Sequence, residues 1–332
     1  MRNNSNAKNF DVRETQIAIK TLKDYFQRDL ANTLNLTRVS APLFVRPETG
    51  LNDNLSGVEK AVGFDIRKYD LHVEIVQSLA KWKRYALEKY GFHEYEGIYA
   101  DMNAIRPDEE LDDIHSAYVD QWDWEKIIRR EDRTIEYLRY IVTEIYSVFK
   151  RTETYINSVY PYILSRKLPD EIQFITSQEL LDRYPNLSPK GRENAIVGEF
   201  GAVFVAQIGS PLTNGDPHDG RSPDYDDWAL NGDLLFHNPV TGKAIELSSM
   251  GIRVDEKSLA AQLEEAGATD RRDMPYHRAV LEGRLPLTVG GGIGQSRICM
   301  FFLERRHIGE VQVSVWPDEL LDQALIRGEK IL

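Results

Sequence analysis

The sequence contains a single cysteine, Cys299, so no disulfide can form within the chain. Chains without disulfides are typical of the reducing cytoplasm. The sequence also lacks any apolar run near the ~18 residues that a membrane helix requires. Its first residues, Met1 to Asp11, are polar and have no apolar stretch of the kind found in signal peptides. We therefore expect a cytoplasmic protein with no membrane partner.

Basic residues are the scarcer charged class, with 41 Lys and Arg against 53 Asp and Glu and a net charge of −12. No block of the chain is rich in Lys or Arg. Affinity for nucleic acid depends largely on such residues, because they neutralise phosphates. The composition therefore favours a small substrate and predicts no nucleic-acid partner, leaving open only a local basic patch in the fold.

Linker-like tracts rich in Pro, Gly or Ser are absent as well, as are internal repeats. Hydrophobic residues make up 42% of the chain and charged residues 28%, as in a globular protein with a sizeable core. A chain of 332 residues can form one large domain or two small ones. Because no linker divides it, we predict a single domain over residues 1–332.

Hydrophobic periodicity predicts both helices and strands. Helices are expected over Arg13–Leu36, from Glu125 to about Val159, over Lys257–Glu265, around Tyr276–Glu282, from about Gly294 to Glu304, and up to Tyr90 with Ser78 as cap and Gly91 as end. Strands are expected over Thr37–Val45, at a sheet margin because of Pro42, and over Gly97–Ile105, Ser116–Trp124, Ala202–Ile208, Leu287–Val289 and Val311–Val315. Asp233–Phe236 and Lys243–Ser249 read as a hairpin. Strands far apart in sequence, with helices between them, predict an α+β fold with a mainly antiparallel sheet flanked by helices.

A glycine cluster is the sharpest chemical signal. Gly290-Gly291-Gly292-Ile293-Gly294 is followed by Gln295-Ser296-Arg297 and an apolar helix. Alternate glycines let a strand backbone approach a flat ligand, and the helix start with Arg297 suits a phosphate. A lone Gly-x-Gly would more often be an ordinary turn with a solvated arginine. Four glycines with an arginine at this spacing favour a nucleotide site, which is neither a Walker loop nor a Rossmann turn.

Arg106 begins a charged loop between the two strands Gly97–Ile105 and Ser116–Trp124. The position places Arg106 at the rim of a sheet. On the returning strand, Gln121 and Asp123 share one face, since side chains alternate along a strand. They form either a polar pair that projects into a cavity or part of a solvated outer face.

Carboxylates on the predicted hairpin form a further candidate site. Asp233 and Glu246 lie on its two arms and could hold Mg²⁺, which takes few protein ligands and completes its shell with water and phosphate. An isolated pair of this kind is more often solvated. In the acidic segment Pro223–Trp228, Asp224 is either part of a surface turn or a ligand for a substrate ammonium. The seven histidines show no metal-ligand spacing, and Cys299 is expected in the core.

Taken in order, these signals resemble the class II aminoacyl-tRNA synthetase pattern. That pattern has a helix and strand ending near a proline, an arginine loop between antiparallel strands, and a Gly-x-Gly-x-Gly-x-x-Arg strand and helix. Here its residues are Pro42, Arg106, Glu109, Gly290, Gly292, Gly294 and Arg297. The likeness implies a fold like the class II synthetase catalytic domain.

More closely, the whole chain is similar to the ammonia-dependent asparagine synthetase A family. The similarity rests on the strings Asp53-Asn54-Leu55-Ser56-Gly57, Ser78–Arg84, Tyr118–Glu125, Pro223–Trp228, Leu230–Asp233 and Glu246–Arg253, which together with Gly290–Arg297 span residues 53 to 297. One departure from the family is the segment Trp228-Ala229 between Asp227 and Leu230, which is short. The family implies an ATP-dependent ligase that makes asparagine from aspartate and ammonia through an aspartyl-adenylate. The class II pattern implies a homodimer, because the helix Arg13–Leu36 and the strand with Pro42 match the segment that pairs its subunits.

The resemblance also implies the site residues. Arg106 and Arg297 would clamp the ATP phosphates and stabilise the charge on departing pyrophosphate. The rest of the ATP site would be Glu109, Glu246, Ser249, Gly292 and Gly294, and Mg²⁺ would be bound by Asp233 and Glu246. At the aspartate, Lys83 and Gln121 would hold the α-carboxylate, Asp123 and Asp224 the ammonium, and Ser78 would line the pocket. Asp53, near the reacting carboxyl, would help to place ammonia.

Other functions stay open at this point. The alternative enzyme is an aspartyl- or asparaginyl-tRNA synthetase, although only about a dozen residues precede the first predicted helix and the chain is acidic. A catalytically inert paralogue that senses an amino acid is the other alternative. The joint presence of Arg106, Arg297, Asp233 and Glu246 argues against it, because a binding protein does not need a pyrophosphate clamp.

Overall fold

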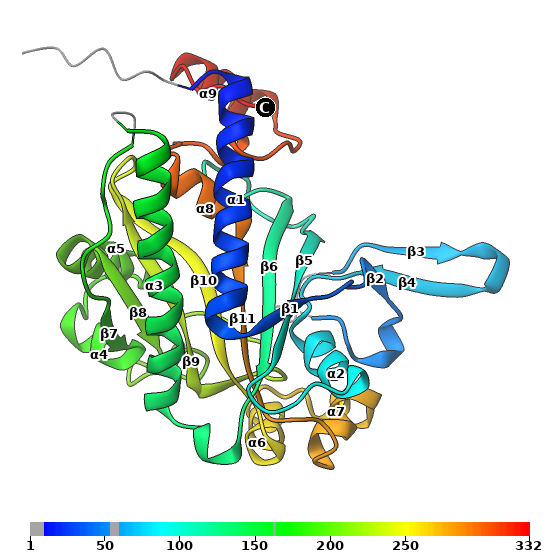
Figure 1. Ribbon diagram of the computed structural model, residues 1–332. Coiled ribbons are helices and arrows are strands. Elements are labelled where there is room, and N and C mark those ends of the chain that lie inside the picture. The colour runs from blue at the N-terminus through cyan, green and yellow to red at the C-terminus, as the bar shows by residue number, and fades with distance from the viewer. Residues whose placement is uncertain (1–9, 54–59, 162–163) are drawn as a thin grey trace, which may run out of the picture.

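The principal feature of the computed structural model, which describes residues 10–53, 60–161 and 164–332, is an eight-stranded sheet (Figure 1). Its strands, in spatial order, are β1 (Leu36–Arg38), β5 (Gly97–Ile105), β6 (Tyr118–Ile127), β11 (Thr288–Gly294), β10 (Lys243–Arg253), β9 (Asp226–Asn238), β8 (Ala202–Ala206) and β7 (Gln173–Thr176). Neighbouring strands are antiparallel except at the two edges, where β1 pairs with β5 and β7 pairs with β8 in parallel. The predicted α+β fold with a mainly antiparallel sheet is confirmed.

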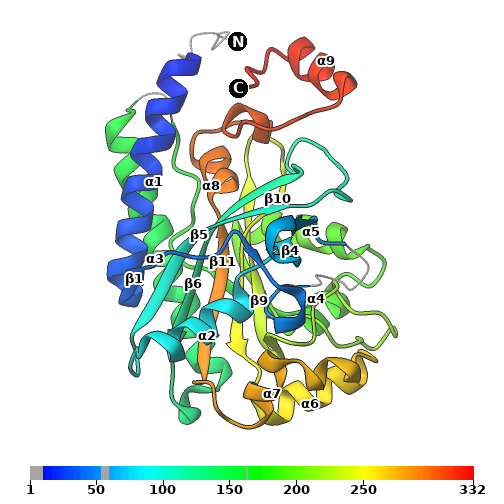
Figure 2. The ribbon, with the colours of Figure 1, turned by 90° about the vertical axis from the view of Figure 1, so that its right-hand side faces the viewer.

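Two long helices cover one face of the sheet. Figures 1 and 2 show α1 (Val12–Leu34) and α3 (Ile135–Val159) side by side on this face, with α4 (Ser177–Arg183) and α5 (Pro189–Phe200) on the other. The apolar stripe of α1 is buried. Its Phe26 stacks on Trp122 of β6 at 5.0 Å and meets Phe149 of α3 edge to face at 5.1 Å. Aromatic pairs of this geometry stabilise a core beyond the area that they bury.

Helix starts agree with the capping residues in the sequence. Asp11 accepts a hydrogen bond from the backbone of Glu14 at the start of α1, and Thr134 accepts one from Tyr137 at the start of α3. Such caps satisfy backbone N–H groups that the first turn leaves free. The remaining helices are α2 (Ala80–Tyr90), α6 (Glu256–Glu265), α7 (Pro275–Leu281), α8 (Gln295–Phe302) and α9 (Asp318–Ile326). Within the described residues, no helix has the length and apolar character to cross a membrane.

A small three-stranded sheet projects from the body as an arm (Figure 1). It consists of β2 (Phe44–Val45), β4 (Leu71–Ile75) and β3 (Gly63–Ile66), in that spatial order and antiparallel throughout. The predicted strand Thr37–Val45 is therefore divided between β1 and β2, which lie at the margins of two different sheets. Its expected place at a sheet margin is confirmed.

Several predicted boundaries are wrong. The helix expected from Glu125 begins only at Ile135, because β6 continues to Ile127 and Glu125 pairs with Gly290 of β11. Val311–Val315, all described, belong to no strand, and Val313 and Val315 are 68% and 83% exposed.

The start of α2 also differs from the prediction. Ser78 is not its cap, since Leu79 holds that position, although the Ser78 hydroxyl accepts a hydrogen bond from the Ala80 N–H. Gly91 ends the helix as predicted, in the left-handed conformation that glycine adopts readily. The short segment Trp228-Ala229 forms no loop, because β9 runs through it.

Candidate active site

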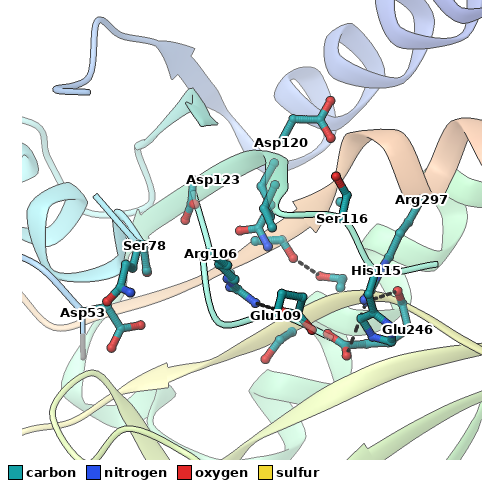
Figure 3. Close-up of a pocket in the computed structure, with 18 of the residues that line it drawn as sticks. Asp53, Ser78, Arg106, Glu109, His115, Ser116, Asp120, Asp123, Glu246 and Arg297 are labelled. Atoms are coloured by element: carbon teal, nitrogen blue, oxygen red, sulfur yellow. Dashed lines mark hydrogen bonds and ion pairs between the residues drawn. The ribbon is translucent and has the colours of Figure 1, made fainter. Parts of the chain in front are cut away.

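A cavity of about 670 Å³ opens on the face of the sheet opposite α1 (Figure 3). Trp122 packs toward α1, so its neighbours Gln121 and Asp123 point to the other side, where they line this cavity. Further walls come from β10, β11, the loop after Arg106, and the segment from Asp219 to Asp226. A cavity of this volume is of the size that binds cofactors and nucleotides.

The glycines of β11 form part of the cavity floor. Gly292 pairs with Asp123 of β6 on one side and with Ser249 of β10 on the other. Gly292, Gly294 and Ser249 all line the cavity. A Cβ atom on Gly292 would overlap Oε1 of Gln121 and lie 3.0 Å from its Cδ. The glycine therefore leaves room for the Gln121 side chain to lie across the strand.

Arg106 and Arg297 both face the cavity. In the view of Figure 3, Asp53 and Ser78 lie at one end, Glu246 and Arg297 at the other, and Arg106 between them. Nη1 of Arg297 lies 3.2 Å from the Glu246 carbonyl oxygen and 3.7 Å from its carboxylate, and Nη1 of Arg106 lies 3.9 Å from the carboxylate of Glu109. The side chains of Arg297 and Arg106 are 24% and 30% exposed, and both line the cavity, where an arginine fork can bind an anion.

Asp123 is held from behind by Lys83. The Lys83 ammonium donates to Asp123, lies 3.3 Å from the Gly291 carbonyl oxygen, and is 3.8 Å from the Glu125 carboxylate. Lys83 is fully buried and does not line the cavity. Burial lowers its pKa, although Asp123 and Glu125 oppose the shift. The structure therefore places Gln121 and Asp123 in the cavity and Lys83 beneath it.

Asp224 lies outside the cavity, with no exposed surface. Its carboxylate accepts hydrogen bonds from Lys81 at 3.0 Å, His277 at 2.9 Å and Arg271 at 3.1 Å. Burial alone would raise the pKa of Asp224, but Lys81 and His277 hold it well below its usual range. Asp226, two residues later, lines the cavity instead, where it pairs with Arg253. The predicted grouping of Asp224 with Gln121 and Asp123 is therefore not found in this structure.

Asp233 and Glu246 lie on adjacent strands, as predicted, but only Glu246 lines the cavity. Asp233 is buried, and its Oδ2 is ion-paired with Arg221. Burial raises the pKa of Asp233 to about 7, with a further contribution from Glu246 and opposition from Arg221.

The residues present partly fit a magnesium ion. Oδ1 of Asp233 is buried and makes no hydrogen bond of ordinary geometry among the described residues, although the Ser249 hydroxyl also interacts with this carboxylate and lowers its pKa. Glu246 supplies a second carboxylate nearby. Within residues 10–53, 60–161 and 164–332, no group of three or more His, Cys, Asp or Glu side chains is arranged to hold a metal. Two carboxylates are enough for Mg²⁺ only if water and phosphate oxygens complete its shell.

Asp53 and Ser78 line the cavity from two separate segments that Asn52 connects. The Asn52 Oδ1 accepts hydrogen bonds from the backbone N–H of Asp53 at 3.0 Å and of Gln77 at 2.9 Å. Its Nδ2 donates to the Ile75 carbonyl oxygen at 3.2 Å. The rest of the string that begins at Asp53, residues 54–57, lies outside the described residues.

Sequence reasoning missed two arginines of the cavity. Arg253 is buried and donates to Glu125 and Asp226, so it anchors the floor beside the glycines. Its place after Glu246–Ser249 is visible in the sequence. Arg221 lies in the long loop between β8 and β9, and its position follows only from the path of that loop. No sequence pattern indicates it.

Known proteins resemble this chain along nearly its whole length. The family described as aspartate-ammonia ligase matches residues 13–327. The aspartate–ammonia ligase of Fusobacterium nucleatum is 61% identical over 310 residues, which cover 93% of this chain and 94% of that protein. The corresponding ligase of Ruminiclostridium cellulolyticum is 59% identical over 314 residues, which cover 94% and 93% of the two chains.

Solved structures resemble it at much lower identity. Asparaginyl-tRNA synthetase from Pyrococcus horikoshii, complexed with asparaginyl-adenylate, superposes with a TM-score of 0.67 at 15% identity, over 91% of this chain and 70% of that one. Aspartyl-tRNA synthetase from Entamoeba histolytica superposes with a TM-score of 0.54 at 15% identity, over 90% and 58% of the two chains. At such identity the likeness concerns the fold alone. It confirms the expected class II synthetase-like architecture.

Proposed function

This chain belongs to the aspartate–ammonia ligase family, and from that premise we propose how its cavity carries out the reaction. The protein is an ATP-dependent ligase that joins aspartate and ammonia to make asparagine. In our proposal the side-chain carboxylate of aspartate attacks the α-phosphorus of ATP, and the bond to pyrophosphate breaks. The nitrogen of ammonia then attacks the carbonyl carbon of this aspartyl-adenylate, AMP leaves, and the nitrogen loses a proton.

The observation that carries this assignment is the meeting of Arg106 and Arg297 with Gln121 and Asp123 around one cavity. Two arginine forks at one cavity suit the phosphates of ATP and the charge that develops on pyrophosphate. Glu109 and Ser249 would complete the ATP site, over the strand that Gly292 and Gly294 keep free of side chains. Positioning and charge neutralisation would then supply most of the rate.

The aspartate would lie at the end of the cavity that contains Asp53 and Ser78. Gln121 can donate to the α-carboxylate, and Asp123 can accept from the α-ammonium. Asp53 would accept a hydrogen bond from ammonia beside the activated carbonyl. Lys83 and Asp224, which lie outside the cavity lining, would act indirectly: Lys83 by orienting Asp123, and Asp224 by anchoring the segment that carries Asp226.

Magnesium would be bound by Asp233 and Glu246 and would neutralise charge on the phosphates. We further propose that the chain forms one domain and a cytoplasmic homodimer. Closed two-fold dimers are the commonest oligomers, and α1 with the β1–β2 segment matches the part that pairs subunits in the class II pattern.

Incubation with Mg-ATP, aspartate and ¹⁵N-ammonium, without tRNA, tests the reaction. We expect ¹⁵N in the side-chain amide of asparagine by NMR, together with release of AMP. Glutamine in place of ammonium should give no product. Label in an α-carboxamide, or a requirement for tRNA, would contradict the proposal.

A further inference from the structure

Arg221 is ion-paired with Asp233, one of the two carboxylates that the proposed function assigns to the metal. Its Nη2 is ion-paired with Oδ2 of Asp233, and its Nη1 lies 3.2 Å from Oδ2 of Asp219. The guanidinium is therefore paired with two carboxylates, and Glu246 also acts on it electrostatically. The side chain is only 13% exposed, yet it lines the cavity. Burial opposes its charge, but these carboxylates keep the pKa of Arg221 above its usual value.

The guanidinium of Arg221 and a metal ion would compete for the negative charge of the Asp233 carboxylate. An ion at Oδ1 of Asp233 would share one carboxylate with the Arg221 cation, which is paired with Oδ2. Like charges within about 4–6 Å disfavour each other strongly. Mg²⁺ also keeps a shell of oxygen ligands at about 2.0–2.1 Å, several of them water, and needs that space. The Asp233 carboxylate can therefore bind either Arg221 or the metal ion strongly, but it cannot bind both strongly at the same time.

We propose that Arg221 takes the place of the metal ion before magnesium binds, and leaves Asp233 when the metal enters with ATP. The inference rests on the proposed function, in which Asp233 and Glu246 hold the metal. It assigns to Arg221 a positioning role for which the family likeness gave no indication. The ATP phosphates, which enter the cavity that Arg221 lines, offer the guanidinium an alternative anionic partner.

This exchange has two effects. Before the metal binds, Arg221 neutralises Asp233, while Arg297 lies 3.7 Å from the carboxylate of Glu246. The strand pair β9–β10 is then not forced apart by two adjacent negative charges. Second, the metal binds weakly until a nucleotide attracts Arg221, so that magnesium and ATP bind together.

Binding of Mn²⁺ to the nucleotide-free protein, followed by the loss of the free-ion EPR signal, tests the proposal without any measurement of activity. Arg221→Gln removes the competing charge and should bind Mn²⁺ about tenfold or more tightly than wild type, since one nearby charge alters a carboxylate's proton affinity by about 10- to 1,000-fold. Arg221→Lys keeps a charge and should stay close to wild type.

The matched control is Arg271→Gln. Arg271 is also 13% exposed and also paired with a buried aspartate, Asp224, which does not line the cavity. Its substitution should leave Mn²⁺ affinity unchanged. Thermal melting of every variant establishes that it is folded.

The double variant Arg221→Gln/Asp233→Asn distinguishes failure of the proposed metal site from failure of the proposed role of Arg221. It should lose the tightened binding. If Arg221→Gln tightens binding and the double variant retains it, the metal lies elsewhere and the proposed metal site fails. If Arg221→Gln leaves Mn²⁺ affinity unchanged or weakens it, the inference about Arg221 is overturned. The metal site still stands in that case if the double variant binds Mn²⁺ more weakly than Arg221→Gln.

Discussion

Adding one methyl group at Gly292 should impair aspartate binding without unfolding the protein. In Gly292→Ala the new Cβ would overlap Oε1 of Gln121, which must retreat by about 1 Å to regain an ordinary van der Waals separation. The neighbour is the end of a flexible side chain, so the backbone can stay in place. Displacement of a positioning group by about 1 Å can cost roughly 100-fold in rate, or about 2.7 kcal/mol. We expect kcat/KM for aspartate to fall by about this factor.

The thermal stability of Gly292→Ala should not fall with its activity, and it should stay the same or rise slightly. Gly292 does not have a positive φ, so alanine can adopt its backbone conformation. Replacement of glycine at such a position commonly stabilises a protein by about 0.4–1 kcal/mol, because the unfolded chain loses freedom. The melting temperature of Gly292→Ala should therefore be equal to that of wild type or slightly higher.

Gly294→Ala is the matched comparison, two residues along the same strand. A Cβ there would meet only the Arg297 side chain, at 3.4–3.8 Å, which is ordinary contact. Its kcat/KM for aspartate should fall far less. In a double-mutant cycle, Gly292→Ala should add little to Gln121→Ala, because both act on the same side chain. Additive losses, or a similar loss in Gly294→Ala, would refute the assignment of Gln121.

Four further predictions follow from the site and the core. Arg297→Lys keeps the charge but loses the planar fork, so steady-state kinetics should show a loss of about 2–4 kcal/mol in transition-state stabilisation, and near-normal turnover would remove Arg297 from the phosphate clamp. Burial raises the pKa of Cys299 to about 12. The thiol should therefore stay protonated and resist thiol reagents at pH 8 until the protein unfolds, and Cys299→Ala should keep its ammonia-dependent activity; rapid labelling of the native protein would contradict this. Because NH₃ and not NH₄⁺ carries the lone pair, the rate at fixed total ammonium should rise with pH through neutrality, and a flat profile would argue against free ammonia as the nucleophile. Light scattering should give twice the chain mass of 38.2 kDa, whereas a fully active monomer would exclude the dimer.

The parts of the fold that could be predicted are those where short-range pattern and tertiary environment agree. The hairpin of β9 and β10 and the strand Gly97–Ile105 follow from local alternation and turn residues. The C-terminal end of β6 could not be predicted from local alternation and turn residues. Trp124 to Ile127 is compatible with either a strand or the start of an amphipathic helix, and only pairing with the neighbouring strands β5 and β11 decides for the strand.

In the candidate site, too, some residues could be placed from local sequence pattern and others could not. Gln121 and Asp123 share a face by strand alternation alone, and both line the cavity. The depth at which a charge lies cannot be read from one sequence. The family resemblance implies that Lys83 and Asp224 contact the substrate, whereas both side chains are completely buried in this structure. Arg221 was missed because a long loop brings it to Asp233, and loop paths have no periodic signal.

The side-chain amide of Asn52 has a consequence for how this fold tolerates change. It accepts hydrogen bonds from the backbone at residues 53 and 77, and donates to the backbone of Ile75 and the side chain of Glu74. The segment at Asn52 and Asp53, between β2 and β3, is thus fastened to the end of β4 and to the segment that follows it. Because the arm is fastened at its base, insertions or deletions at its tip should not alter the spacing between Asp53 and Ser78. The arm can therefore vary in length and surface among related proteins while the reaction chamber retains its shape.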